Sequence, residues 1–491
     1  MQSYKANSLS NNINNNISNK DKWVFTLLLA IIFWMPVPLG SNRPWAWGIL
    51  EILCYAVCTA SVFYHYTGIK ANARRFWPAF VCFGVFLLWV VIQQLPLPEA
   101  LVKALSPNAH TLFTLPATIP YSQNSMPNGI LNNTSTAYFI SVDPGQTTIA
   151  LYKTLAYISL FIATLLLCNT QQRIKTIMLT IIITGLFQAM YGTLEVLLGA
   201  TNSLVFHLPV KNVATGTFVY KNHYANYLML CLSMGVGYLV STLINTAPAT
   251  KKARLRQFLN SLLNGKAAVR IALAIMVIAL VMSRSRMGNT AFFAAMTAIG
   301  LLALFLIKKR SKGLTLLIVS MFLIDMLILS AWFGLDKVKD RLENTSLTEE
   351  TRDEVVRDSI PLLKDFALTG TGMGSFYTIY PKYQSSEVNA FYDHAHNDYL
   401  QFAIEAGIPV SALLLIVPLY SFYCAIKAMR KRKNPIMLGL SFGCLMAILG
   451  MFIHIWVDFP LQAPANTGLF VIILALSLIS LKRTKKGYLV V

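Results

Sequence analysis

Apolar segments of about 20 residues recur along almost the whole chain and constrain its fold more than any other feature. Hydrophobic residues make up 55% of the 491 residues and charged residues only 12%, against about 25% charged residues in soluble domains. A water-soluble core does not need this much apolar surface, whereas a bilayer-spanning helix does. The sequence therefore predicts an all-α polytopic membrane protein with about twelve transmembrane helices. The expected spans are 23–39, 45–66, 76–95, 149–168, 174–198, 223–243, 270–283, 287–307, 314–334, 408–426, 436–457 and 464–481.

Basic residues are concentrated in the short loops on one side of the predicted bundle. Twelve spans place both termini on this side, and the positive-inside rule makes it cytoplasmic. The net charge of +21 then belongs to cytoplasmic loops, and we expect no nucleic-acid partner. The residues concerned are Lys70, Arg74, Arg75, Lys251, Lys252, Arg254, Arg256, Lys308, Lys309, Arg310, Lys312, Lys427, Arg430, Lys431, Arg432, Lys433, Lys482, Arg483, Lys485 and Lys486.

Long polar segments and a polar N-terminus divide the chain into four parts. Residues 1–22 are rich in Asn and Ser and are expected to form a disordered cytoplasmic tail. Residues 23–334 carry spans one to nine, including a periplasmic loop at 96–148. Residues 335–407 hold most of the acidic residues and form a second, large periplasmic loop. Residues 408–491 carry the last three spans and a basic cytoplasmic tail.

The second loop is expected to be ordered and helical. Ser346-Leu347-Thr348-Glu349 matches a capping box. Val355, Val356, Leu363 and Phe366 follow as a helical stripe that Pro361 is expected to break.

The most polar part of this loop, Asp393-His394-Ala395-His396-Asn397-Asp398, is followed closely by the apolar run that starts near 408. Histidine is the usual general base near neutral pH, so His394 and His396 are candidates for that role. A solvated or helix-capping histidine is the simpler alternative. A His-x-His pair is only a weak metal signal without further ligands, and we expect no metal.

Two further groups of cations fall on the same predicted side. Arg284 and Arg286 lie in a short outer loop, where arginine is disfavoured unless it snorkels to the interface or is paired. Their functional interpretation is an anion site, because one guanidinium group can donate two parallel hydrogen bonds to phosphate oxygens. Lys211, Lys221 and His223 form the second group, for which an interfacial tyrosine-rich loop is the alternative.

Other polar features receive no catalytic assignment. The glycines of 370–375 fit neither phosphate-binding pattern and predict a tight turn. Glu51, Lys153, Glu195 and Asp325 are charged residues within predicted spans, to which the sequence assigns no role.

The ordered set of motifs resembles the bacterial O-antigen ligase and polymerase superfamily of membrane glycosyltransferases. The matching segments span nearly the whole chain, although each is loose. They are His396-Asn397-Asp398-Tyr399-Leu400 with Glu405 and Gly407, the glycines of 370–376, Ser283-Arg284-Ser285-Arg286, Gly216-Thr217-Phe218 with Asn222-His223-Tyr224-Ala225, and residues 38–45 and 457–466.

This resemblance implies a class-C glycosyltransferase-like fold and a glycan donor carried on undecaprenyl diphosphate. It implies His396 as the residue that deprotonates or orients an acceptor hydroxyl, and Arg284 and Arg286 as the cations for the leaving diphosphate. Glu405 or Asp398 would hold the imidazole tautomer. We further expect Lys211, Lys221, His223, His394, Asn397 and Asp398 in substrate binding, and no cofactor, because the donor is already activated.

The family's acceptors are lipid A core, a growing glycan or a protein hydroxyl, and the sequence does not choose among them. The predicted protein is thus an O-antigen ligase-like enzyme of the bacterial inner membrane, in contact with membrane lipids. A repeat-unit polymerase or a protein O-oligosaccharyltransferase is the alternative within the family. A transporter or flippase, or a non-catalytic assembly partner, is the alternative outside it.

Overall fold

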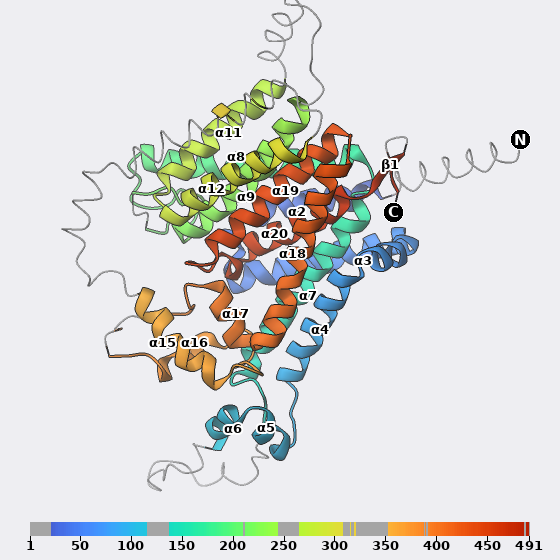
Figure 1. The fold of residues 1–491 in the computed structure, drawn as a ribbon. Helices are drawn as coiled ribbons and strands as arrows, with labels where there is room; N and C mark the ends of the chain where they lie inside the picture. Colours follow the sequence, from blue (N-terminus) through green and yellow to red (C-terminus); the bar gives the residue numbers. More distant parts are fainter. Residues whose placement is uncertain are drawn as a thin grey trace, which may run out of the picture.

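The computed structural model is a helical bundle with one small hairpin (Figure 1). It describes residues 21–114, 137–209, 212–243, 265–307, 315, 319–320, 352–386, 388, 391–485 and 488–490. Within these ranges seven helices are long and apolar enough to cross a membrane, and four shorter apolar helices accompany them. These findings confirm an all-α polytopic membrane protein.

Each predicted span except one coincides with an apolar helix. The predicted span 314–334 lies almost wholly outside the described residues, so the total of twelve stays a prediction. The apolar helices are α2 (Lys22–Trp34), α3 (Pro44–Arg75), α4 (Trp77–Gln93), α7 (Pro144–Leu167), α8 (Gln171–Leu197), α9 (Lys221–Leu243), α11 (Gly265–Met282), α12 (Arg286–Leu306), α18 (Ile408–Lys431), α19 (Pro435–His454) and α20 (Pro464–Ser480).

Short elements connect and cover these helices. Helices α5 and α6 belong to the first predicted loop, and α15 to α17 to the second. The elements are α5 (Glu99–Leu105), α6 (Pro107–Thr114), α15 (Arg352–Asp365), α16 (Phe376–Ile379), α17 (Asp398–Ala406), the 3₁₀ turns η1 (Leu39–Ser41), η3 (Tyr380–Lys382) and η4 (Pro460–Gln462), and an antiparallel hairpin of β1 (Arg483–Lys485) and β2 (Tyr488–Val490).

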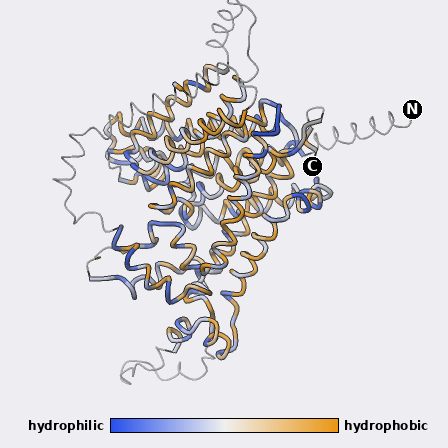
Figure 2. The backbone as a smooth tube through the Cα atoms, in the orientation of Figure 1, coloured by the Kyte–Doolittle hydropathy of each residue, from blue (hydrophilic) through white to orange (hydrophobic). Residues whose placement is uncertain are grey.

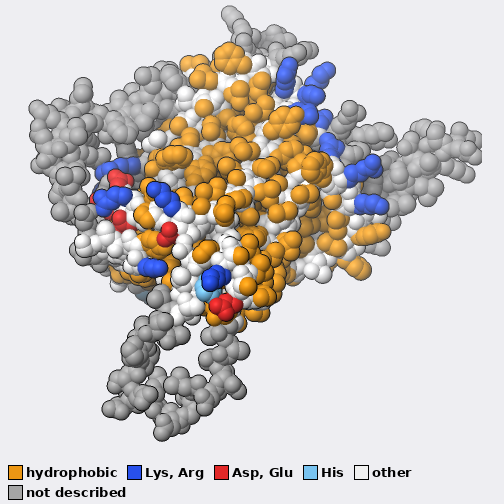
Figure 3. Space-filling model, turned by 60° about the horizontal axis from the view of Figure 1, so that its bottom comes forward, with side chains coloured by type: hydrophobic (Ala, Val, Ile, Leu, Met, Phe, Trp, Pro, Cys, Tyr) orange, Lys and Arg blue, Asp and Glu red, His pale blue; other side chains and the backbone are white. Residues whose placement is uncertain are grey.

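Helices α9 and α19 pack closely at the centre of the bundle. A Cβ atom on Gly237 would lie 2.4 Å from the carbonyl oxygen of Gly439, and one on Gly439 would lie 2.3 Å from that of Gly237. Small residues allow two membrane helices to approach this closely. The pair is antiparallel, because Asn226 near the start of α9 contacts His454 at the end of α19. The helices are hydrophobic along most of their length (Figure 2), and many apolar side chains lie on the surface of the bundle (Figure 3).

The bundle has two chemically different ends. At one, here called the basic end, α3 and α18 finish in basic residues. Arg75 and Arg432 both donate there to the carbonyl oxygen of Leu481, and the hairpin meets α7–α8 through Leu489 N and Asn169 O, 2.8 Å apart. The first described residue, Asp21, and the C-terminal hairpin therefore lie at the same end. The opposite end, here called the motif end, holds the starts of α9, α12 and α20 and the end of α19.

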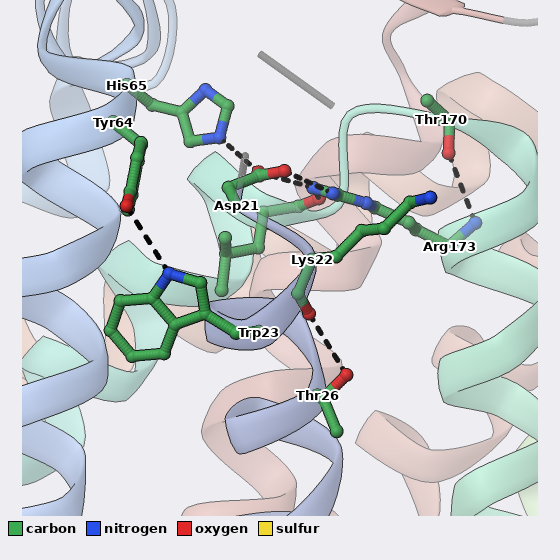
Figure 4. Close-up of polar contacts among 9 residues, drawn as sticks. Asp21, Lys22, Trp23, Thr26, Tyr64, His65, Thr170 and Arg173 are labelled. Carbon is green, nitrogen blue, oxygen red and sulfur yellow. Dashed lines mark hydrogen bonds and ion pairs between the residues drawn. The ribbon is translucent and has the colours of Figure 1, made fainter. Parts of the chain in front are cut away.

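A buried ion triad stabilises the basic end (Figure 4). The Asp21 carboxylate accepts hydrogen bonds from Arg173 Nη2 and Nη1, at 2.5 and 2.7 Å, and contacts His65 Nε2 at 2.6 Å. The Asp21 side chain is fully buried and that of Arg173 is 8% exposed. Burial alone would raise the pKa of Asp21, but the hydrogen bonds and charges of Arg173 and His65 prevail and lower it to about 2. The triad joins the start of α2 to α3 and α8.

In the described part of the second predicted loop, residues 352–386, 388 and 391–407 form a small helical layer over the motif end. The break expected at Pro361 is wrong. Helix α15 runs without interruption through Pro361, although proline costs about 3 kcal/mol in a helix interior. Pro361 is exposed, whereas Val355, Leu362 and Phe366 are buried in one cluster, so tertiary packing outweighs the local penalty. The capping box at 346–349 lies outside the described residues.

Candidate functional site

Three imidazoles surround the ring of Phe459 at the motif end. The ring centroids of His394, His396 and His223 lie 4.6, 4.7 and 4.9 Å from that of Phe459. His394 and His396 come from the second loop, His223 from the first turn of α9, and Phe459 from the segment after α19. The sequence predicts His223 in one group and His394 and His396 in another. In the structure, the three residues form a single cluster. Phe459 had been noted only as part of a motif.

The backbone of His396 is held in an unusual conformation. Its φ is +51°, in the left-handed region that few non-glycine residues adopt. The next two residues fix it in place. Asn397 caps α17 by accepting a hydrogen bond from Leu400 N at 3.1 Å, and Asp398 N donates to the carbonyl oxygens of Ile455 and Asp458. Backbone strain of this kind is concentrated at functional sites. Asn397 thus has a structural task besides its predicted role in substrate binding.

Arg284 and Arg286 lie in the turn between α11 and α12, at the same end of the bundle as the imidazoles. Both side chains are exposed, and Arg284 is also left-handed, with a φ of +50°. This turn packs on the start of α9: a Cβ atom on Gly288 would lie 2.5 Å from the Cβ of Ala225, two residues after His223. The cationic turn therefore neighbours the helix that carries His223 and Lys221. Lys211 lies outside the described residues.

Glu405 is buried and connects the glycine-rich turn to α17. Its carboxylate accepts hydrogen bonds from Gly374 N at 2.9 Å, Phe376 N at 3.3 Å and Gln401 Nε2 at 3.1 Å. The turn is tight, as predicted, because Gly370, Gly372 and Gly374 all have positive φ. A Cβ atom on Gly372 would lie 2.1 Å from Ser141 Oγ, so this glycine is required both by its conformation and by the available space.

Glu405 and Asp398, the two carboxylates predicted to hold the tautomer of His396, occupy different positions. Glu405 reaches His394 through Gln401, whose Nε2 lies 3.1 Å from His394 Nδ1. Asp398 accepts hydrogen bonds from Leu461 N at 2.9 Å and Gln462 Nε2 at 3.0 Å, and so anchors η4. Burial lowers the pKa of His394, which favours the neutral imidazole that can accept a proton. Gln401, which the sequence interpretation did not single out, is the link between these groups.

Glu405→Gln is expected to reduce the pH dependence of stability. Burial raises the pKa of Glu405 from 4.5 to about 7, against hydrogen bonds from Gly374, Gln401 and Phe376. The folded chain therefore binds this proton more tightly than the unfolded chain. The resulting stabilisation is fully present below about pH 4.5 and is lost as the pH rises through about 7.

Thermal unfolding of the purified protein between about pH 4.5 and 8 measures this effect. The wild type should lose stability as the pH rises, and the glutamine variant should show a shallower slope. Asp353→Asn, at an exposed position of α15, is the control and should keep the wild-type slope. Identical slopes for all three proteins would contradict a buried, protonated Glu405.

The fold and this polar cluster define a polytopic membrane protein with a candidate active site at one end of its helical bundle. Residues 271–415 match the family model described as O-antigen ligase, which supports the O-antigen ligase superfamily inferred from the motifs. The matched segment contains Arg284, Arg286, His394, His396 and Glu405, but not His223. The match indicates a glycosyltransferase-type enzyme of polysaccharide biosynthesis. No curated protein matches the chain.

Proposed function

We propose that this protein transfers a glycan from an undecaprenyl-diphosphate carrier to an acceptor hydroxyl, as an O-antigen ligase-like enzyme. The observation that carries the proposal is the convergence of His223, His394 and His396 on Phe459, beside the turn that bears Arg284 and Arg286. Most of these residues fall within the segment that matches the ligase family. The imidazole cluster would supply a proton acceptor, and the neighbouring turn would supply cations for a departing diphosphate.

In the proposed reaction, the acceptor oxygen attacks the anomeric carbon of the donor glycan. The bond between that carbon and the diphosphate oxygen breaks, and the hydroxyl proton passes to His396. Arg284, Arg286 and Lys221 stabilise the negative charge of the leaving diphosphate. Glu405 acts through Gln401 to orient His394, which packs on the same Phe459 ring as His396. Asp398 positions η4 and Asn397 positions α17.

The positive-inside rule orients the proposed enzyme in the bacterial inner membrane. Basic residues at the ends of α3 and α18 support a cytoplasmic basic end. The motif end then faces the periplasm, where a lipid-linked glycan and its acceptor would meet. This orientation would place both chain termini in the cytoplasm.

Reconstitution tests the proposed function directly. The purified full-length protein is incubated with undecaprenyl-diphosphate oligosaccharide and, separately, with lipid A core, a second lipid-linked repeat or a serine-containing peptide. Mass spectrometry should detect a covalent glycan adduct with lipid A core. An adduct with the second repeat or the peptide instead would replace the ligase by a polymerase or a protein oligosaccharyltransferase. Donor that crosses the vesicle membrane without forming any adduct would indicate a flippase.

A further inference from the structure

An apolar cavity that is partly open to the surroundings lies between helices of the bundle, next to segments of the candidate site. Its volume is about 380 Å³, within the range typical of ligand pockets. Helices α4, α7, α20 and α18 surround it as a ring in which each helix packs on the next. Helix α17 covers its motif end with Tyr399 and Phe402. Along α18 the lining extends from Ile408 to Pro418, about 15 Å at the rise of an α-helix.

The chemistry of the wall suits a chain-like apolar ligand with a negatively charged head. Most lining side chains are aliphatic or aromatic, and Lys153 and Asp398 carry the formal charges. The Asp398 carboxylate already accepts hydrogen bonds from Leu461 and Gln462. Lys153 is therefore the charged group of the wall that is available to a ligand.

Lys153 is only partly compensated by its protein neighbours. Its Nζ lies 3.9 Å from the centroid of the Trp47 ring, a contact worth about 2 kcal/mol when it is desolvated. Across the described part of the chain, no carboxylate lies within ion-pair distance of this ammonium. Glu51, one helical turn after Trp47, acts on Lys153 electrostatically from beyond ion-pair distance, and its buried Oε1 has no hydrogen-bond partner. An ionisable residue at membrane depth is a candidate for function, and a cation in an apolar cavity attracts an anion.

The cavity is lined in part by the two segments that carry the imidazole cluster. Burial raises the pKa of Glu405 and lowers that of His394, and the charge of Lys153 acts on both groups and lowers both pKa values. Lys153 is therefore close enough to interact electrostatically with both residues. His396 lies two residues before Asp398, which lines the cavity. Leu461, which also lines the cavity, lies two residues after Phe459, so the cavity adjoins both segments of the cluster.

We propose that this cavity binds the first isoprene units of the glycan donor's lipid chain, next to the diphosphate, and that Lys153 binds a phosphate of the carrier. The inference rests on the proposed function, which supplies a single-chain lipid with an anionic head. The small volume and the aromatic lining fit one such chain better than a phospholipid with two acyl chains. Lys153 becomes an additional substrate-binding residue, on a helix that the family match does not cover.

Photocrosslinking tests this assignment without requiring transfer. The probes are a photoreactive farnesyl diphosphate and the matching farnesyl alcohol, bound to the purified full-length protein in detergent. Crosslinks should map to lining residues such as Phe402, Phe470 and Leu474. Lys153→Gln should weaken binding of the diphosphate by about 10-fold to 100-fold, because one charge-assisted contact is lost, and leave binding of the alcohol unchanged. Lys153→Arg should retain most of the affinity.

Matched variants separate a charge effect from a packing effect. Lys427→Gln, at the basic end of α18, should change neither probe. Ala403→Phe, which fills the cavity, should weaken both probes. The assignment is overturned by crosslinks that map elsewhere, by equal weakening of both probes in Lys153→Gln, or by equally effective competition from phosphatidylglycerol.

Glycan transfer by the same variants keeps the two proposals distinguishable. Intact transfer together with no crosslinking in the cavity would contradict the cavity assignment alone. Crosslinking in the cavity together with no transfer to any acceptor would count against the transferase function.

Discussion

His396→Ala is expected to reduce glycan transfer by about 10²–10⁴-fold, the usual effect of removing a general base. His396 is the imidazole whose backbone is held in the left-handed region, on the edge of the Phe459 ring. Without the His396 imidazole, no proton acceptor remains at this position. Transfer is measured with the reconstituted protein and, in cells, by the length distribution of surface polysaccharide on a gel.

His207→Ala is the matched control for this variant. His207 also has a positive φ, of +52°, but is exposed in the segment after α8. It therefore reports the cost of placing alanine in the left-handed region without touching the imidazole cluster. The control should transfer glycan at the wild-type rate. Wild-type transfer by His396→Ala, at a normal amount of folded protein, would refute the proposed base.

Arg173→Met is expected to cause the largest loss of stability, about 3–5 kcal/mol. The substitution removes the guanidinium that donates two hydrogen bonds to the fully buried Asp21 carboxylate. That carboxylate is then left with His65 alone in a buried environment. Thermal or denaturant unfolding in detergent measures the effect, which should appear as a lower midpoint.

Two companion variants define the cause of this loss. Arg74→Met removes an exposed arginine at the same end of the bundle and should change stability by less than about 0.5 kcal/mol. Asp21→Asn combined with Arg173→Met removes the isolated negative charge and should recover part of the loss. An effect of Arg173→Met no larger than that of Arg74→Met would show that the triad does not stabilise the fold.

Helix positions could be predicted because each span carries its own hydrophobic signal. The match between predicted and observed spans rests on local runs of apolar residues and requires no knowledge of neighbours. Pro361 shows where local rules fail. The sequence indicates a break, but the burial of Leu362 and Phe366 against other segments keeps α15 continuous.

The candidate site was harder to predict because its members meet only after folding. His223 and His396 are more than 170 residues apart along the chain, and no sequence pattern indicates that both pack on Phe459. The link from Glu405 through Gln401 to His394 is similarly tertiary. Lys153 appeared in the sequence as an isolated charge without a role. Only the ring of helices around the cavity shows that Lys153 lines an apolar pocket, which is the basis of its proposed role in binding a phosphate.

The backbone contact between α9 and α19 also determines which part of the protein can bend. Gly237 and Gly439 bring the two backbones so close that any Cβ atom would clash, and this contact ties the helix that carries His223 to the helix that precedes Phe459. Helix α18, on the other side of the cavity, contains Pro418 in its interior, which removes one backbone hydrogen bond at the cavity wall. Pro418 therefore places the point at which α18 bends most easily against the wall of the proposed lipid cavity.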